Sequence, residues 1–190
     1  MRRELRIAVL TEDMYEDVEF WYPFYRLKEA GYLPIVIGSG KKDSFQGIHG
    51  LPNKADMSIK DAKAENFDAV VVPGGYAPDR MRLHPEFAQF VKLMHDRGKL
   101  VASLCHGPWI LASAGIVNGR KLTCWPSLKD DLMNAGARYI DDRVVLDGNM
   151  ITSRCPDDLP AFMAEVIRYL AAEEGGRREK AVVAASAGGR

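Results

Sequence analysis

The chain has 190 residues, and its 26 lysines and arginines balance 26 aspartates and glutamates, so its formal net charge at pH 7 is zero. This length favours one domain with its own core, and 47% hydrophobic residues fit an ordinary globular protein. A chain without excess positive charge has no general attraction for nucleic-acid phosphates or anionic lipid. We therefore expect neither nucleic acid nor a membrane as partner.

The N-terminal stretch and the cysteines indicate a compartment. The apolar run in MRRELRIAVLTED is about five residues long, shorter than a secretory signal requires, and no window approaches the ~20 apolar residues that span a bilayer. The three cysteines, Cys105, Cys124 and Cys155, are scattered and odd in number. They favour reduced thiols over a disulfide framework, which predicts a cytoplasmic protein.

Short strand-like runs alternate along the chain with longer helical patterns. The predicted strands are 6–11, 32–39, 69–75, 99–104 and 121–125, and the predicted helices are 17–31, 85–98, 108–115, 127–136 and 155–174. Residues 138–154 predict a hairpin around Asp147 and Gly148, and residues 45–61 predict an excursion with a small hairpin.

This alternation predicts a mostly parallel sheet with helices on both faces. Sites in such sheets lie at the carboxyl ends of the strands, which selects residues 11–16, 73–79 and 105–108. We expect a single domain over residues 1–174. The small residues and basic cluster of residues 175–190 predict a flexible tail.

A thiol occupies the turn between a predicted strand and helix in KLVASLCHGPWILASAG, residues 99–115. The helix that starts at Pro108 presents unpaired N–H groups and a positive dipole end, which would lower the pKa of Cys105 below the ~8.5 of a free cysteine. His106 could then act as base or proton carrier. The alternative is that Cys105 is a small hydrophobic residue ending a buried strand.

Four motifs together resemble the PfpI-type intracellular protease and deglycase family of the class I glutamine amidotransferase-like superfamily, over about residues 5–172. They are YEDVEFWYPFYRLKEAG (15–31), VPGGYAPDRMR (72–82), SLCHGPWILASAG (103–115) and TSRCPDDLPAF (152–162). The resemblance implies a flavodoxin-like three-layer α/β sandwich with a nucleophile elbow at Cys105.

The resemblance also implies a carboxylic acid beside the sulfur, at Glu16. A protonated carboxyl there would donate a hydrogen bond to Cys105, since a neighbouring thiolate raises a carboxyl pKa. The alternative is an acid that complements a helix start, with Asp13 and Asp17 as similar bystanders.

Two further candidate site residues lie at or after the paired glycines Gly74 and Gly75. The resemblance implies that Asp79 reaches His106 of a second subunit, although many relatives have glutamate there; the alternative is a helix-start acid paired with Arg80 or Arg82. Gly75 could offer its N–H, with that of His106, to an oxyanion, and could equally serve a tight turn with positive φ.

Other signals point to no cofactor and no metal. The stretch GSGKKDSFQG (38–47) lacks a phosphate-loop fingerprint, and His49, His84 and His95 lack metal-ligand spacing. Cys155 follows Arg154 and precedes a helix, which predicts a lowered pKa and ranks it second as a nucleophile.

These observations predict a self-associating cysteine hydrolase. Cys105 would attack a peptide carbonyl, a reactive aldehyde such as methylglyoxal, or a glycation adduct, as a peptidase, glyoxalase or deglycase. The alternative is a redox stress sensor or holdase chaperone that works through oxidation of Cys105.

Overall fold

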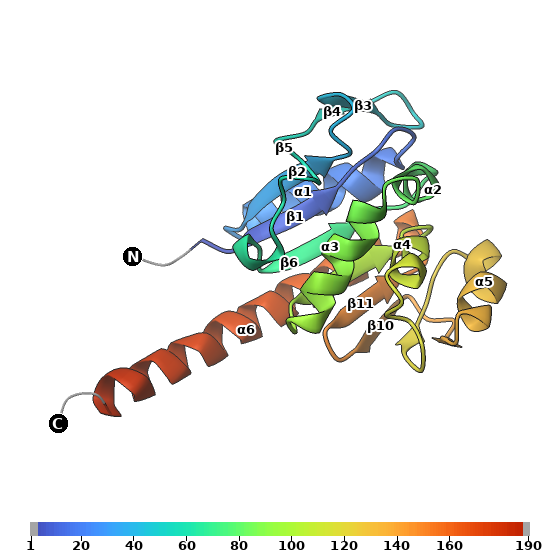
Figure 1. Cartoon of the computed structure of the whole chain (residues 1–190). Helices are drawn as coiled ribbons and strands as arrows, with labels where there is room; N and C mark the ends of the chain where they lie inside the picture. Colours follow the sequence, from blue (N-terminus) through green and yellow to red (C-terminus); the bar gives the residue numbers. More distant parts are fainter. Residues whose placement is uncertain (1–3, 188–190) are drawn as a thin grey trace.

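The computed structural model describes residues 4–187, and a seven-stranded sheet forms the middle layer of this part of the chain (Figure 1). The strand order is β10-β11-β7-β6-β1-β2-β5. The strands are β1 (Arg6–Leu10), β2 (Leu33–Gly38), β5 (Met57–Ser58), β6 (Ala69–Val72), β7 (Leu100–Leu104), β10 (Val144–Asp147) and β11 (Met150–Ser153). Adjacent strands run parallel except β10, which is antiparallel to β11.

The central strands are buried on both sides, which explains their continuous apolar sequences. Every residue of β6 and β7 is buried, and Val71 pairs with Ala102 between them. A parallel sheet needs helices on both faces because each face carries apolar side chains. The predicted mostly parallel sheet is therefore confirmed.

Helices cover both faces and complete the three-layer sandwich (Figure 1). On one face α1 (Asp17–Glu29) packs beside α6 (Leu159–Ala187), and on the other α3 (Pro85–Asp96) packs beside α4 (Pro108–Ser113), with the short α2 (Ala77–Met81) against α4. The remaining elements are α5 (Lys129–Asn134), β3 (Ser44–Gln46), β4 (Pro52–Lys54), β8 (Lys121–Leu122), β9 (Arg138–Tyr139), and the 3-10 turns η1 (Ala64–Asn66), η2 (Pro126–Leu128) and η3 (Pro156–Asp158).

Both predicted hairpins are present. β3 pairs antiparallel with β4 inside the predicted excursion, and β10 pairs with β11 around a turn in which Gly148 has φ +63°. The predicted strand 121–125 differs, because only Lys121–Leu122 is extended as β8 and it pairs with β9 outside the central sheet. The place beside β11 is occupied by β10.

The last helix extends further than the sequence predicts. α6 runs to Ala187, so residues 175–187 continue a helix where we predicted a flexible tail, and residues 188–190 lie outside the described part of the chain. Among the residues whose burial the structure describes, the last that α6 places in the core is Leu170.

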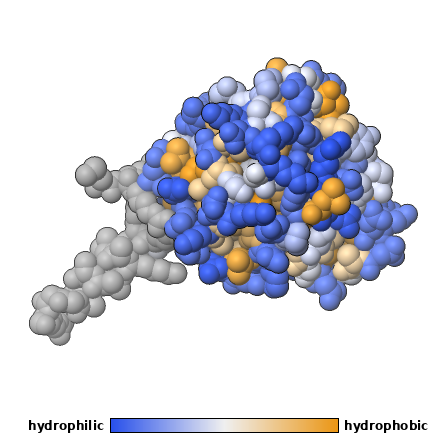
Figure 2. Space-filling model, turned by 45° about the horizontal axis from the view of Figure 1, so that its top comes forward, coloured by the Kyte–Doolittle hydropathy of each residue, from blue (hydrophilic) through white to orange (hydrophobic). Residues whose placement is uncertain are grey.

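The molecular surface carries no extended apolar belt on the face shown in Figure 2, where hydrophilic residues surround separate hydrophobic patches. Among the described helices, none is long and apolar enough to cross a membrane.

Candidate active site

Cys105 forms a strained elbow between β7 and α4. Its φ is +56°, a left-handed conformation that residues with a side chain rarely adopt. The bend is tight because a Cβ on Gly107 would lie 2.4 Å from the carbonyl oxygen of Val72. The backbone of Cys105 is held at both ends: its N–H donates to Ser153 (3.1 Å), and its carbonyl accepts from the N–H of Trp125 (3.0 Å). Such an elbow projects one side chain above the sheet edge.

The carboxyl group beside this sulfur is that of Glu19, not Glu16. Glu19 is fully buried in the first turn of α1, and its Oε2 accepts from the N–H of Gly74 at 2.9 Å. A Cβ on Gly74 would lie 2.5 Å from this oxygen and 2.6 Å from the Cβ of Cys105, so only glycine fits between the two groups.

The environment of Glu19 keeps its carboxyl protonated at neutral pH. Burial raises the pKa of Glu19 to about 8, and the charge of Glu16 adds to this, against the lowering effect of hydrogen bonds with Cys105 and Gly74. A protonated carboxyl carries an O–H group that can donate a hydrogen bond. The other carboxyl oxygen of Glu19, Oε1, is buried and has no hydrogen-bond partner within the described part of the chain.

Glu16 instead caps the start of α1, which corrects its predicted contact with the sulfur. Its Oε2 accepts from the N–H of Glu19 at 2.8 Å, and its Oε1 lies 3.5 Å from Nε2 of His49. The backbone of Glu16 is still extended (φ −75°, ψ 123°), because this residue precedes the first turn of α1. Glu19, three positions later, lies within the helix on its buried face. Asp13 and Asp17 are bystanders: Asp13 pairs with Lys42, and Asp17 accepts from loop N–H groups.

The sequence contained a signal for Glu19. The buried face of α1 repeats at helical spacing through Glu19, Pro23 and Leu27. A glutamate at a core-facing position of an otherwise apolar stripe requires a partner, because burying an unpaired carboxyl is unfavourable. The acids that the sequence analysis considers, Glu16, Asp13 and Asp17, lie outside this stripe.

His106 lies beside the sulfur and is enclosed by aromatic rings. Its Nδ1 is 3.2 Å from Sγ of Cys105. Its ring centroid lies 6.2 Å from Tyr76, 5.2 Å from Trp109 and 6.2 Å from Trp125. Burial lowers the pKa of His106, so the imidazole is neutral at pH 7 and can accept a proton. Within the described residues of this one chain, no carboxylate bonds to it.

Asp79 lies on the surface of α2. It is exposed and lines a groove of about 360 Å³ with Met14, Tyr76, Arg80 and Leu83. Neither of the arginines weighed as its partner pairs with it, because Arg80 contacts Sδ of Met14. The other, Arg82, donates to Ser113.

The backbone N–H groups of Gly75 and His106 both hydrogen-bond the Cys105 sulfur, and each lowers its pKa. Gly75 has φ +75°, and a Cβ there would lie 2.4 Å from the backbone nitrogen of Glu16. The tight-turn interpretation of Gly75 is thus met, and the same turn directs its N–H into the site.

The pKa of the Cys105 thiol is raised, whereas we predicted a lowered pKa. Burial raises the pKa of Cys105, and the neighbouring Glu19 raises it further, which together outweigh the two N–H groups. The residue is only 6% exposed, and α4 is six residues long, so a short helix dipole cannot offset desolvation. The resting site therefore holds a neutral thiol next to a neutral imidazole.

The second-ranked cysteine is a poorer nucleophile than predicted. Burial and the charge of Asp158 raise the pKa of Cys155. Arg154, which was expected to lower this pKa, forms ion pairs with Asp158 and Asp141. Burial likewise raises the pKa of Cys124 to about 12.

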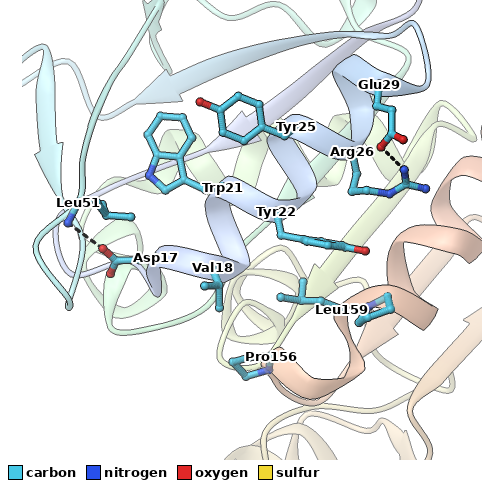
Figure 3. Close-up of a pocket in the computed structure, with 11 residues that line it drawn as sticks. Asp17, Val18, Trp21, Tyr22, Tyr25, Arg26, Glu29, Leu51, Pro156 and Leu159 are labelled. Atoms are coloured by element: carbon cyan, nitrogen blue, oxygen red, sulfur yellow. Dashed lines mark hydrogen bonds and ion pairs between the residues drawn. The ribbon is translucent and has the colours of Figure 1, made fainter.

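A separate apolar groove of about 550 Å³ runs between α1 and the start of α6 (Figure 3). In Figure 3, Tyr22 and Val18 lie on the side of α1 toward Leu159 and Pro156, whereas Trp21 and Tyr25 lie beside each other on the other side of the helix. The lining of this groove contains neither cysteine nor histidine, so it does not supply the thiol and imidazole that meet at Cys105.

The model of the DJ-1/PfpI family matches residues 5–169. The chain belongs to the DJ-1/PfpI family. A deglycase of Pyrococcus abyssi is 44% identical over 166 residues, which cover 87% of this chain and 99% of that protein. YraA of Bacillus subtilis, named a putative cysteine protease, is 39% identical over 165 residues, covering 87% of this chain and 98% of that protein. The predicted resemblance is confirmed.

Solved structures of DJ-1/PfpI members agree with the fold. Drosophila melanogaster DJ-1beta gives a TM-score of 0.83 at 29% identity, covering 95% of this chain and 98% of that one. A two-domain protein of Anabaena variabilis, with DJ-1/ThiJ/PfpI-like and ferritin-like domains, gives a TM-score of 0.87 at 42% identity. This chain is covered to 88% and spans 48% of that longer protein.

Proposed function

We propose that the protein is a cysteine-dependent hydrolase that acts on a carbonyl electrophile, either a peptide or a reactive-carbonyl compound such as a glycation adduct. The observation that carries this is Nδ1 of a neutral His106 at 3.2 Å from Sγ of Cys105 on a strained elbow. Support comes from relatives named deglycase and putative cysteine protease, which favour turnover over the alternative of an oxidation sensor. All three cysteines are free, in keeping with the predicted reducing cytoplasm.

The proposed reaction starts from the neutral thiol. As Sγ of Cys105 attacks the carbonyl carbon, its proton passes to Nδ1 of His106, and the carbonyl π electrons become an oxyanion. The N–H groups of Gly75 and His106 stabilise that oxyanion. The protonated Glu19 donates to the sulfur and moderates its negative charge. With a peptide substrate, the oxyanion electrons re-form the carbonyl, the C–N bond breaks, and His106 gives its proton to the leaving amine, which leaves a thioester on Cys105. Water then attacks the thioester with His106 as base, the C–S bond breaks, and the acid and the Cys105 thiol are released.

Turnover assays on Cys105→Ala test the proposal. Wild type is measured against methylglyoxal, a glycated amine and a fluorogenic peptide, with Cys155→Ala as the matched control because it removes an accessible thiol elsewhere. We expect Cys105→Ala to lose about a thousandfold or more in kcat/KM on whichever substrate turns over. Cys155→Ala should stay within about twofold of wild type. Full turnover by Cys105→Ala would rule the function out.

We further propose that the protein self-associates and that Asp79 serves His106 of a second subunit. The exposed, unpaired Asp79 and the absence of a carboxylate on His106 in the described chain support this. The test is complementation between two variants. Asp79→Ala and Cys105→Ala should each have low activity when assayed alone. When mixed and reassembled they should regain activity, since some hybrid sites combine an intact Cys105 with a partner's intact Asp79. A monomeric mass in solution, or mixing without gain, would exclude the role of Asp79.

A further inference from the structure

His106 is held by rings rather than by polar partners. Tyr76, Trp109 and Trp125 reach it from the loop after β6, from α4 and from the segment before η2. Its hydrogen-bonding partner within the described chain is Sγ of Cys105. A single contact to one nitrogen leaves the ring free to rotate, so the aromatic walls must restrict its orientation.

Trp109 is the most firmly anchored of these walls. Its Nε1 donates to Oδ2 of Asp131 on α5 at 2.9 Å. The Cζ atom of Arg82 lies 5.8 Å from its ring, and the same guanidinium donates to Ser113 on α4 at 3.0 Å. The indole thus has fixed partners on two sides, and its edge meets the imidazole at 66° with ring centroids 5.2 Å apart.

We propose that Trp109, anchored by Asp131, is a positioning residue that keeps the imidazole of His106 turned with Nδ1 toward the Cys105 sulfur and shielded from water. This rests on the proposed function, in which His106 is the base. In this proposal Trp109 acts through His106, since its side chain contacts the imidazole and donates its hydrogen bond to Asp131.

The proposal predicts how His106 titrates. Burial lowers its pKa, and the indole of Trp109 is part of that burial. The titratable and charged groups around it are the Cys105 thiol, the Tyr76 phenol, and behind the indole the opposite charges of Asp131 and Arg82. Removing the indole admits water, so the pKa of His106 should rise toward its ordinary value of ~6.5.

The experiment compares Trp109→Ala, Trp109→Phe and Asp131→Ala, with Asp130→Ala as the matched control. Asp130 and Asp131 share the first turn of α5, and Asp131 is the one that accepts from Trp109. Three measurements are made: the NMR titration of His106, the rate at which iodoacetamide alkylates Cys105, and the pH profile of kcat/KM.

In Trp109→Ala we expect the His106 midpoint to rise, the acid limb of kcat/KM to move to higher pH with it, and kcat to fall about 10- to 100-fold with a smaller change in KM. Alkylation near pH 7 should slow. Trp109→Phe should restore part of each effect, Asp131→Ala should shift each in the same direction, and Asp130→Ala should match wild type.

An unchanged His106 titration and alkylation rate in Asp131→Ala and Trp109→Phe would overturn the proposal, even if Trp109→Ala failed to fold. Failure of the proposed function is separable: no variant, wild type included, would then turn over any substrate. The His106 midpoint and the alkylation rate would still shift if Trp109 positions the ring.

Discussion

At the scale of single residues, the site couples two buried acids. Cys105 and Glu19 both have raised pKa values because burial disfavours either charge; the charge of Glu19 raises the pKa of Cys105 further, whereas the hydrogen bond with Cys105 lowers that of Glu19. The pair is therefore neutral at rest. In the proposed reaction the sulfur acquires its charge when His106 takes the proton, and the protonated Glu19 can donate to it at that moment.

This coupling makes stability depend on Glu19 and pH. Because burial raises the pKa of Glu19 from its ordinary value of 4.5 to about 8, the folded protein retains a proton that the unfolded chain loses between these pH values. The stabilisation is full below pH 4.5 and is lost as pH rises toward 8, by at most about 5 kcal/mol. We expect Glu19→Gln, which cannot ionise, to remove this loss in urea unfolding at pH 5 and pH 8.

Glu29→Gln is the control for this measurement. It removes an exposed carboxylate at the other end of α1 that does not contribute to the raised pKa of Glu19, so its unfolding free energy should follow the wild-type pH dependence. If Glu19→Gln and wild type lost the same stability between the two pH values, a protonated Glu19 in the folded state would be ruled out.

At the scale of elements, three turns after β1, β6 and β7 supply the site. The turn after β6 is constrained most, since Gly74 separates Glu19 from Cys105 and Gly75 lies against the backbone of Glu16. Both glycines are needed for close approach, and Gly75 also for its positive φ.

Gly75→Ala should therefore affect both stability and activity. The new Cβ would meet the backbone nitrogen of Glu16 at 2.4 Å, so the turn must shift and take its N–H away from the sulfur. We expect a fall of about 2 kcal/mol or more in unfolding free energy and of about 10- to 100-fold in kcat.

Gly98→Ala is the control that separates backbone strain at a positive φ from displacement of the turn by an added Cβ. Gly98 has φ +69°, but an added Cβ would meet nothing within 4 Å, so the variant should lose about 1 kcal/mol through backbone strain with kcat unchanged. Equal effects of the two substitutions on kcat would argue against a role for the Gly75 N–H.

At the scale of the whole molecule, the core residues that the structure describes on α6 all lie in the first part of this long helix. α6 buries Leu159, Phe162, Met163, Val166 and Leu170, at helical spacing, and no later residue joins the core among those described. Gly175 and Gly176 follow, and glycine is a weak helix former.

We therefore expect residues 1–176 to fold as the complete domain. A chain that stops after Gly176 should melt within about 2 °C of the full chain and retain its kcat, because it keeps every core residue that the structure describes. Truncation after Phe162 would remove Met163, Val166 and Leu170 and should abolish folding. A large fall in melting temperature after the first cut would show that the later helix stabilises the domain.

How much could be predicted from the sequence differs between the fold and the site. Apolar runs of strand length, separated by helical patterns, predicted the parallel sheet, and the strand-turn-helix pattern around Cys105 predicted the elbow. These are local properties, since periodicity follows from which side chains each element must bury. The hairpins at residues 45–61 and 138–154 were accessible for the same reason.

The identity of the acid and the protonation of the sulfur were decided by the tertiary structure. Glu16 and Glu19 are three residues apart, and only the packing of α1 against the sheet determines which carboxyl faces Cys105. The sequence also suggested a helix dipole that would ionise the thiol, whereas burial at 6% exposure outweighs it. Sequence patterns report local preference, but solvent exclusion and the contact between distant turns arise only when the whole chain has packed.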